Sequence, residues 1–263
     1  MDAVFCGSPL SPLSAAAAEC LDREMTLRLV IVPPAGQDIR KRLDDGWLYT
    51  LSLVVVGCFR LLNCLLRKVG IKRAKGYTCL KEYLIDHPDI PVASWDGHGD
   101  GLRCLVERSG IPRDGRVGVL VSCVYPYRLP DRLDGFGCLV NIHPGLLPEN
   151  RGPMPHFWAL TRREVVSGIA FHRLARNWDA GDILYQRHFR IDHRYSEFGV
   201  EKLAQEALTG SASVVFRDLR FYWNAAVPQQ GGSYYKKPSN VDRLAERRRS
   251  VIRWRDVMGL WST

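Results

Sequence analysis

Short apolar runs alternate with helix-like segments along the first part of the chain. Apolar residues fill positions 3–6 and 27–32, and an alanine-rich stretch over 11–23 separates these two runs. Short apolar runs closed by turn residues are typical of strands that are buried on both faces of a parallel sheet. Ser11 and Ser14 are candidate N-caps for the helix predicted over 11–23. This strand–helix–strand opening predicts a doubly wound, Rossmann-like α/β fold with a mostly parallel sheet.

The same alternation continues beyond residue 200. It predicts helices at 77–85, 102–108, 155–163 and 197–222, and strands at 90–92, 117–124, 168–174 and 183–191. Segment 47–75 is unusual, because an apolar stretch that ends at Arg60 precedes a cluster of basic residues. The stretch is short for a membrane span. A buried helix with a solvated basic end is the preferred interpretation, and contact with a membrane or a partner is the alternative.

Two polar side chains, Asn141 and His143, stand near the end of a further strand. They are two positions apart, so on an extended strand they project to the same side. A Pro-Gly pair and a second proline then turn the chain. Open α/β sheets place their reactive groups at such strand ends. Asp179 precedes Ala-Gly, a predicted tight turn, and could complete an Asn/His/Asp set in space.

A family resemblance is carried by three segments, NIHPGLLPENRGPMPHFWAL, SGIAFHRL and WDAGDILYQ. In order and spacing they resemble the signature of the folate-dependent formyltransferases. That family includes enzymes acting on methionyl-tRNA, on glycinamide ribonucleotide and on nucleotide-linked amino sugars. The resemblance covers residues 138–186 most clearly, and it is closest to the small biosynthetic N-formyltransferases. It implies 10-formyltetrahydrofolate as the co-substrate and catalysis by Asn141, His143 and Asp179.

The chemistry of these three side chains agrees with that implication. Formyl transfer to an amine requires a stabilised oxyanion, and an Asn amide is a neutral donor suited to it. A His that titrates near neutrality can take the proton of the amine. A neighbouring carboxylate orients that His and stabilises its protonated form. We therefore assign Asn141 to the oxyanion, His143 to proton transfer, and Asp179 to orienting His143 or relaying protons through water.

Other polar residues have weaker assignments. The remaining histidines are interpreted as structural, although His156 and His172 lie inside the matching motifs and could border the acceptor pocket. By resemblance, the pterin ring of the folate is bound mainly through backbone groups, near Ser122, Cys123, Tyr125, Leu129, Gly181 and Asp182. For Asp182, a second functional carboxylate and a plain turn role are both open, and the turn role is slightly preferred.

Acceptor contacts are assigned to Gly7, Ser8, Pro9 and Arg151. Gly7-Ser8-Pro9 is neither a GxGxxG motif nor a P-loop, so a plain connecting turn is an equally good interpretation.

Composition favours an ordinary globular enzyme. The chain has 263 residues, of which 46% are hydrophobic and 25% are charged, as in an average globular protein. Its eight cysteines are scattered without a CxxC pair, which argues against zinc and against a disulfide framework, and for a reducing cytoplasm. The first residues lack a basic signal-peptide region. We expect a cytoplasmic homodimer.

The chain changes character at a Gln-Gln-Gly-Gly segment, which predicts a catalytic domain over 1–227 and a basic C-terminal extension over 228–263. Residues 236–255 hold eight Lys or Arg against two acids. Contact with nucleic acid or a phosphorylated acceptor is one interpretation of this pattern. A solvated helix face with partner contacts is preferred. The extension is also too short for the C-terminal β-barrel of methionyl-tRNA formyltransferases, so tRNA is a disfavoured acceptor.

The preferred function is therefore N-formylation of a small biosynthetic amine. A nucleotide-linked amino sugar is the first candidate, and an N-hydroxylated amino acid or another specialised amine is the second. The competing hypothesis is a non-catalytic relative that binds folate, nucleic acid or a membrane-associated partner. The complete set of Asn141, His143 and Asp179 argues against loss of catalysis.

Overall fold

The computed structural model describes residues 1–35, 77–110, 118–192 and 194–239, with a few positions between 57 and 69 and positions 241–242. Most of the 47–75 segment and most of the chain beyond 239 lie outside the described residues. The predictions made for these two segments therefore concern residues that the structure does not describe. Among the described residues, none of the helices combines the length and apolar character that a membrane span needs.

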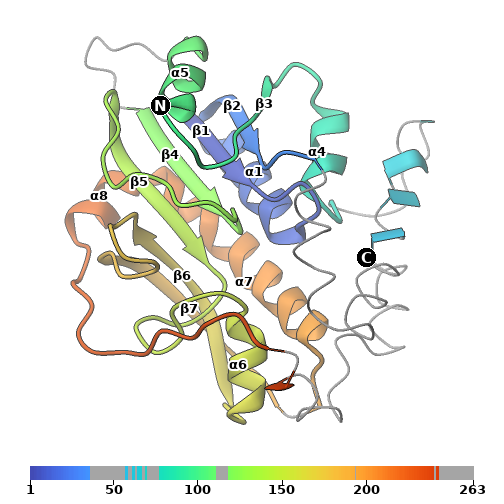
Figure 1. Cartoon of the computed structure of the whole chain (residues 1–263), viewed down its shortest axis with the longest axis vertical. Coiled ribbons are helices and arrows are strands. Elements are labelled where there is room, and N and C mark those ends of the chain that lie inside the picture. The colour runs from blue at the N-terminus through green and yellow to red at the C-terminus, as the bar shows by residue number, and fades with distance from the viewer. Residues whose placement is uncertain are drawn as a thin grey trace.

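A seven-stranded sheet runs through the molecule in the order β3-β2-β1-β4-β5-β6-β7 (Figure 1). Its strands are β1 (Asp2–Gly7), β2 (Thr26–Val32), β3 (Val92–Ser94), β4 (Gly118–Cys123), β5 (Phe136–His143), β6 (Val166–Arg173) and β7 (Ile183–Arg190). The first five are mutually parallel, whereas β6 is antiparallel to β5 and β7 is antiparallel to β6. The predicted mostly parallel sheet is confirmed.

The described helices are α1 (Pro12–Glu24), α4 (Leu80–Asp86), α5 (Gly101–Arg108), α6 (Pro155–Thr161), α7 (Glu197–Arg217) and α8 (Leu219–Asn224). Of the two candidate caps, Ser11 is the N-cap of α1, and its side chain accepts a hydrogen bond from the backbone N–H of Ser14. Such a bond satisfies one of the unpaired N–H groups of the first turn.

Two predicted elements are wrong in detail. The single helix over 197–222 is broken at Asp218, which leaves helical geometry between α7 and α8 (φ −105°, ψ 29°). Aspartate competes with the helix through its own side chain, so it favours helix ends. The strand expected at 90–92 is displaced to β3, because Pro91 has no N–H to donate, while Val92 pairs with Val30.

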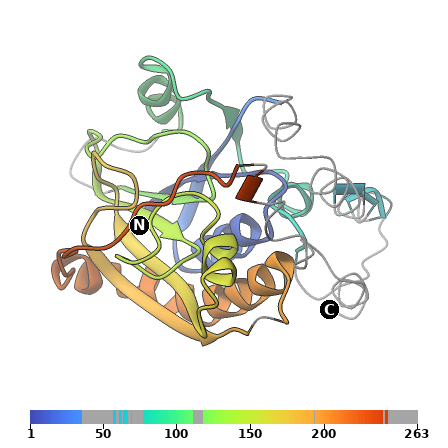
Figure 2. The ribbon, with the colours of Figure 1, turned by 60° about the horizontal axis from the view of Figure 1, so that its bottom comes forward.

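The core lies on both faces of the sheet because successive strand residues point to opposite sides. In β1, Ala3 and Phe5 join the cluster that contains side chains of α1, α4 and α7. Val4 and Cys6 join the opposite cluster, to which α5 contributes. Figures 1 and 2 show α1 and α7 side by side on one face, and the two helices are in contact. Helices therefore cover both faces, as the doubly wound fold requires.

The carboxyl ends of the central strands meet at one edge. Gly7 of β1 pairs with Cys123 of β4, which pairs with Ile142 of β5. His143 is the last residue of β5. Since β6 returns antiparallel beside β5, His172 lies opposite Asn141. β6 ends at Arg173, opposite Val140, and the loop that follows folds back so that Asp179 reaches Asn141 and His143 at the end of β5.

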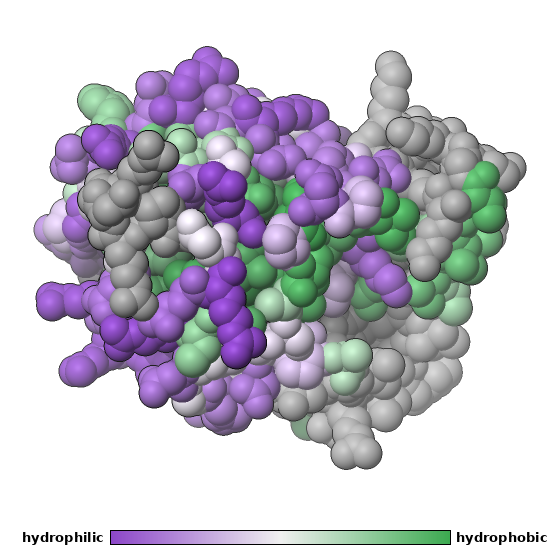
Figure 3. All heavy atoms as spheres, turned by 90° about the horizontal axis from the view of Figure 1, so that it is seen from above, coloured by the Kyte–Doolittle hydropathy of each residue, from purple (hydrophilic) through white to green (hydrophobic). Residues whose placement is uncertain are grey.

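After α8 the chain runs across the loop that follows β5. We call residues 227–236 the C-terminal strap; it is the orange-to-red segment that passes in front of β6 and β7 in Figure 1. It begins with an antiparallel bridge between Val227 and Ile183, and later forms a parallel bridge between Tyr234 and Arg151. Seen from above, hydrophilic residues cover much of the described surface, with hydrophobic residues showing between them (Figure 3).

Candidate active site

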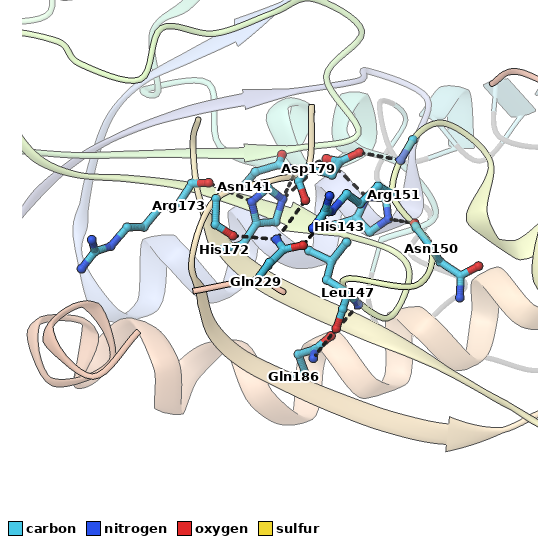
Figure 4. A network of polar contacts seen from close by, with 12 residues as sticks. Asn141, His143, Leu147, Asn150, Arg151, His172, Arg173, Asp179, Gln186 and Gln229 are labelled. Carbon is cyan, nitrogen blue, oxygen red and sulfur yellow. Dashed lines mark hydrogen bonds and ion pairs between the residues drawn. The ribbon is translucent and has the colours of Figure 1, made fainter. Parts of the chain in front are cut away.

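The three residues singled out from the sequence lie together (Figure 4). Asn141 and His143 come from the end of β5, and Asp179 comes from the loop between β6 and β7. The Asn141 Nδ2 lies 3.3 Å from Asp179 Oδ1, and the His143 Nδ1 lies 3.6 Å from the same oxygen. The tight turn predicted at Asp179 is present, and Asp179 has a left-handed backbone with φ 52°. One carboxylate oxygen thus faces both an amide and an imidazole.

The tautomer of His143 is fixed by the loop that follows it. Its Nε2 lies 2.7 Å from the backbone carbonyl oxygen of Asn150. A carbonyl can only accept, so Nε2 carries the hydrogen and the neutral ring keeps its lone pair on Nδ1. A proton taken up by His143 therefore arrives at Nδ1, directly beside the Asp179 carboxylate.

Burial lowers the pKa of His143, and the charge of Asp179 opposes this effect. The imidazole is thus neutral and able to accept a proton at neutral pH. Burial alone would raise the pKa of Asp179, but its interactions with His143 and with the backbone N–H of Gly152 hold that pKa well below its usual range. That N–H donates to Asp179 Oδ2 at 2.9 Å. The resting site pairs a neutral base with a carboxylate.

The amide of Asn141 is oriented by His172. The Nδ1 of His172 lies 2.8 Å from the carbonyl oxygen of Arg173 and so donates to it, which leaves Nε2 as an acceptor. Asn141 Nδ2 donates to that Nε2 at 3.0 Å and to Asp179 at the longer 3.3 Å. The longer contact is the one that a developing oxyanion can replace. His172 is therefore part of the network around the three side chains.

The loop after β5 is held tightly around His143. A Cβ on Gly145 would come within 2.9 Å of His143 Nε2, so this position has no room for a side chain. The backbone of Leu147 exchanges two hydrogen bonds with the Gln186 side chain, at 2.8 and 2.9 Å. Neither Gln186 nor the Asn150 carbonyl was predicted from the sequence. The carbonyl could not be, because every residue has one and its identity leaves no signature.

The residues assigned to the folate are mostly buried. Ser122, Cys123, Tyr125 and Leu129 all belong to the core. The Tyr125 hydroxyl donates to the Trp95 carbonyl at 2.8 Å, and the Cys123 carbonyl accepts from the Ser14 hydroxyl at 2.8 Å. Any contact that this stretch makes with a ligand must come chiefly from the backbone, as the resemblance implies. The assignment stays a prediction.

In the second turn, a Cβ on Gly181 would lie 2.0 Å from the carbonyl oxygen of Arg173. Glycine is needed there for close packing. Asp182 forms an ion pair with Arg173 at 3.0 Å. Asp182 thus has a structural partner, while a ligand contact by Gly181 or Asp182 stays a prediction.

The residues assigned to the acceptor have internal partners. The Ser8 N–H donates to Ser14 Oγ at 3.1 Å, and the Ser8 carbonyl accepts from the Ser11 N–H. A Cβ on Gly7 would be 2.5 Å from the Phe5 ring. These contacts support the connecting-turn interpretation of Gly7-Ser8-Pro9.

Arg151 is similarly engaged, because its Nε donates to Gln229 Oε1 at 2.8 Å and its Nη2 to the Gly231 carbonyl at 2.9 Å. Its contact with an acceptor, and those of residues 7–9, stay predictions. Within the described ranges, no cluster of three or more His, Cys, Asp or Glu side chains could hold a metal ion.

The segment that builds this site has recognisable relatives. Residues 132–212 match the family model described as formyl transferase. This segment is similar to that family. The resemblance found in the sequence is thereby confirmed, and the matched segment includes Asn141, His143 and Asp179.

A methionyl-tRNA formyltransferase of Borreliella afzelii is 39% identical over 67 residues, which is 26% of this chain and 21% of the relative. The chain thus matches about a fifth of the length of this curated relative.

Solved structures extend the likeness in fold to most of the chain. The phosphoribosylglycinamide formyltransferase of Bacillus halodurans superposes with a TM-score of 0.57 at 16% identity, covering 83% of this chain and 95% of the other. An N-formyltransferase from Helicobacter canadensis, in complex with folinic acid and dTDP-3-aminofucose, has a TM-score of 0.56 at 13% identity. It covers 90% of this chain and 71% of the other. At such identities the likeness establishes the fold.

Proposed function

We propose that the protein is an N-formyltransferase that moves a formyl group from 10-formyltetrahydrofolate to the amine of a small biosynthetic acceptor. The observation that carries the proposal is the state of His143. It is a buried, neutral imidazole whose free nitrogen lies beside the Asp179 carboxylate, with the Asn141 amide on the same oxygen. This donor set fits an activated formyl group, which needs one hydrogen-bond donor and one base.

Each of the three side chains has a defined task. The bound folate would donate the formyl group, with the folate nitrogen that carries this group as the leaving group. The Asn141 N–H donates to the formyl oxygen as negative charge develops during attack by the amine. His143 takes the amine proton at Nδ1, and Asp179 stabilises the imidazolium from 3.6 Å. The same proton can then return to the departing nitrogen when the tetrahedral intermediate collapses.

Folate use is supported by relatives of known structure. The Helicobacter canadensis enzyme was solved with folinic acid, a formylated folate. In this chain, the carboxyl ends of β1 and β4 lie beside the end of β5 at one edge of the sheet, where Asn141 contacts Asp179. That edge is where open α/β sheets bind their ligands. A folate bound there brings its formyl group to Asn141 and His143.

A nucleotide-linked amino sugar is the acceptor that we favour. The fold is similar to that of an enzyme solved with dTDP-3-aminofucose, which supports this acceptor. Local sequence identity is 39% to a methionyl-tRNA formyltransferase, which favours methionyl-tRNA as the second candidate. The two acceptors share a primary amine and differ in everything that surrounds it.

The test supplies radiolabelled 10-formyltetrahydrofolate together with dTDP-3-amino and dTDP-4-amino sugars, an N-hydroxylated amino acid, glycinamide ribonucleotide or methionyl-tRNA. Label is expected on an amino sugar with the wild-type protein, and at background with His143→Ala. Label on another amine alone would replace the acceptor while leaving the reaction class intact. No label on any of them, together with no heat of folate binding, would overturn the proposal.

A further inference from the structure

We propose that Gln229 is a positioning residue that holds the Asp179 turn against the loop after β5 and thereby sets the geometry of the His143–Asp179 pair. The inference rests on the proposed function, since it takes these two residues as part of the catalytic site. Gln229 lies in the C-terminal strap, far in sequence from both. It is half-buried and lies among the residues of the network, beside Asp179 and Arg151 (Figure 4).

The amide of Gln229 joins two loops. Its Nε2 donates to the carbonyl oxygens of Asp179 at 2.9 Å and of Gly181 at 2.6 Å. Its Oε1 accepts from Arg151 Nε at 2.8 Å. Both amide hydrogens and one acceptor position are therefore in use, and every partner belongs to the Asp179 turn or to the loop after β5. Few other side chains could make this set of contacts, because it needs two donors and one acceptor on a planar group.

The Asp179 turn needs an external hold. Asp179 has φ 52°, a conformation that is unfavourable for a residue with a Cβ and persists only where its surroundings enforce it. The neighbouring Trp178 side chain is 44% exposed, so packing gives the turn little support on that side. The Gly152 N–H fixes the carboxylate of Asp179, while Gln229 fixes its backbone.

The strap is itself anchored on both sides of Gln229. Before it, Val227 and Ile183 exchange backbone hydrogen bonds at 2.8 and 2.9 Å. After it, the Tyr235 N–H donates to the Arg151 carbonyl at 2.9 Å, and the Tyr235 ring stacks on Trp158 with centroids 5.3 Å apart. A side chain held between two such anchors has little freedom to move away from the turn.

The strap also acts on the second partner of His143. The Arg162 guanidinium lies 4.2 Å from the centroid of the Tyr235 ring and donates to the Asn150 side chain. The Asn150 carbonyl in turn fixes the His143 tautomer. Hence one extended segment supports both polar partners of the His143 ring, Asp179 and Asn150. Gln229 is the strap side chain that bonds directly to the Asp179 turn.

Gln229→Met is the informative variant, because it keeps the length of the side chain and removes all three hydrogen bonds. Gln230→Met is the matched control, since Gln230 is the next residue and is exposed. We expect kcat to fall by about 10- to 100-fold in Gln229→Met, with KM for the folate nearly unchanged. The ring titration of His143, followed by NMR, should shift to lower pH because Asp179 is held less closely. Gln230→Met should match the wild type in both measurements.

A second variant, Gln229→Glu, retains an oxygen for Arg151 but replaces the two donors to the turn with a charged acceptor oxygen. It should lower kcat as Gln229→Met does, and so separates the turn contacts from the Arg151 contact. A wild-type rate and an unchanged His143 titration in both Gln229 variants would overturn the inference. So would loss of the fold in both, since the residue would then serve global stability.

The two proposals can fail separately. If the wild type transfers no formyl group, the NMR titration of His143 still decides whether Gln229 positions the pair. If the wild type is active and the Gln229 variants behave like the Gln230 control, only the role of Gln229 is lost.

Discussion

His143 has a different fixed partner at each ring nitrogen. Its Nε2 donates to the Asn150 carbonyl at 2.7 Å, and its Nδ1 lies 3.6 Å from Asp179. Burial keeps the ring neutral at rest, whereas the carboxylate favours the protonated ring. A base with this environment can accept a proton during reaction and return it. The carboxylate charge is the part that a single substitution can remove.

Asp179→Asn should move the pH dependence of the reaction. Without the carboxylate charge, the pKa of His143 falls further, because burial is no longer opposed. His143 acts as a base only when neutral, so the rising limb of kcat/KM against pH should shift to lower pH. The rate should fall by about 100-fold or more, since the imidazolium loses its counter-charge. The fold should survive, because Asn tolerates the left-handed backbone. An unchanged profile and rate would contradict the assigned role.

Asn141→Ala tests the oxyanion donor. Its amide acts on charge that develops during reaction, so kcat should fall by about 10²- to 10³-fold while KM for the folate changes little. Asn177→Ala is a suitable control, since Asn177 is an exposed residue of the loop that carries Asp179. Steady-state kinetics that show a rise in KM alone, or equal effects in both variants, would remove Asn141 from the chemistry.

At the scale of elements, α6 places a buried histidine beside the site. Both ring nitrogens of His156 are buried without a hydrogen-bond partner among the described residues. Burial lowers its pKa to about 3, and the nearby His143 contributes in the same direction. A buried polar ring without partners costs stability even when neutral. His156 therefore makes α6 sensitive to acid.

His156→Leu should stabilise the protein increasingly as the pH falls. Between an unfolded pKa of about 6.5 and the folded value of about 3, only the unfolded chain binds a proton at this residue. The free energy of unfolding contributed by His156 thus falls by roughly 1.4 kcal/mol per pH unit below about 6.5. Urea unfolding at pH 7 and pH 5 should show a gain from the substitution that is about 2 kcal/mol larger at pH 5. A gain independent of pH would contradict this account.

Local spacing in the sequence predicted β5 and its end at His143, and spacing together with the family resemblance selected Asn141, His143 and Asp179. The role of His172 could not be ranked, because its contact with Asn141 depends on β6 returning antiparallel some thirty residues later. Gln229 gave no signal, since its partners lie about fifty residues away in the chain. Sequence patterns report periodicity within an element, whereas these contacts are made between elements that only the fold brings together.

At the scale of the whole molecule, the C-terminal strap connects the start of β7 with the loop after β5. Besides its backbone bridges, it accepts the indole N–H of Trp158 at the Lys236 carbonyl, 3.0 Å away. Glycines at 152 and 232 permit the close approach, since a Cβ on either would lie 2.1 Å from a carbonyl oxygen. The strap is packed against the loops that build the candidate active site. The boundary predicted between 227 and 228 stays a prediction, which truncation can test.

Two shortened chains separate the strap from the basic residues that follow it. A chain of residues 1–239 retains every strap contact described above, whereas a chain of residues 1–226 lacks them all. We expect the first to keep the melting temperature and His143 titration of the full chain. The second should melt at least ~5 °C lower, which corresponds to about 2 kcal/mol. Equal melting temperatures for the two chains would show that the strap is a separable extension.

The most direct test of the central claim is single-turnover formyl transfer, measured together with folate binding on the same protein. Labelled 10-formyltetrahydrofolate, a dTDP-amino sugar and an excess of protein are mixed, and formylated product is followed over time. The account predicts transfer by the wild type, and transfer by His143→Ala that is at least about 100-fold slower at unchanged folate affinity. Wild-type protein that does not bind the folate, or a His143→Ala variant that transfers at the wild-type rate, would contradict it.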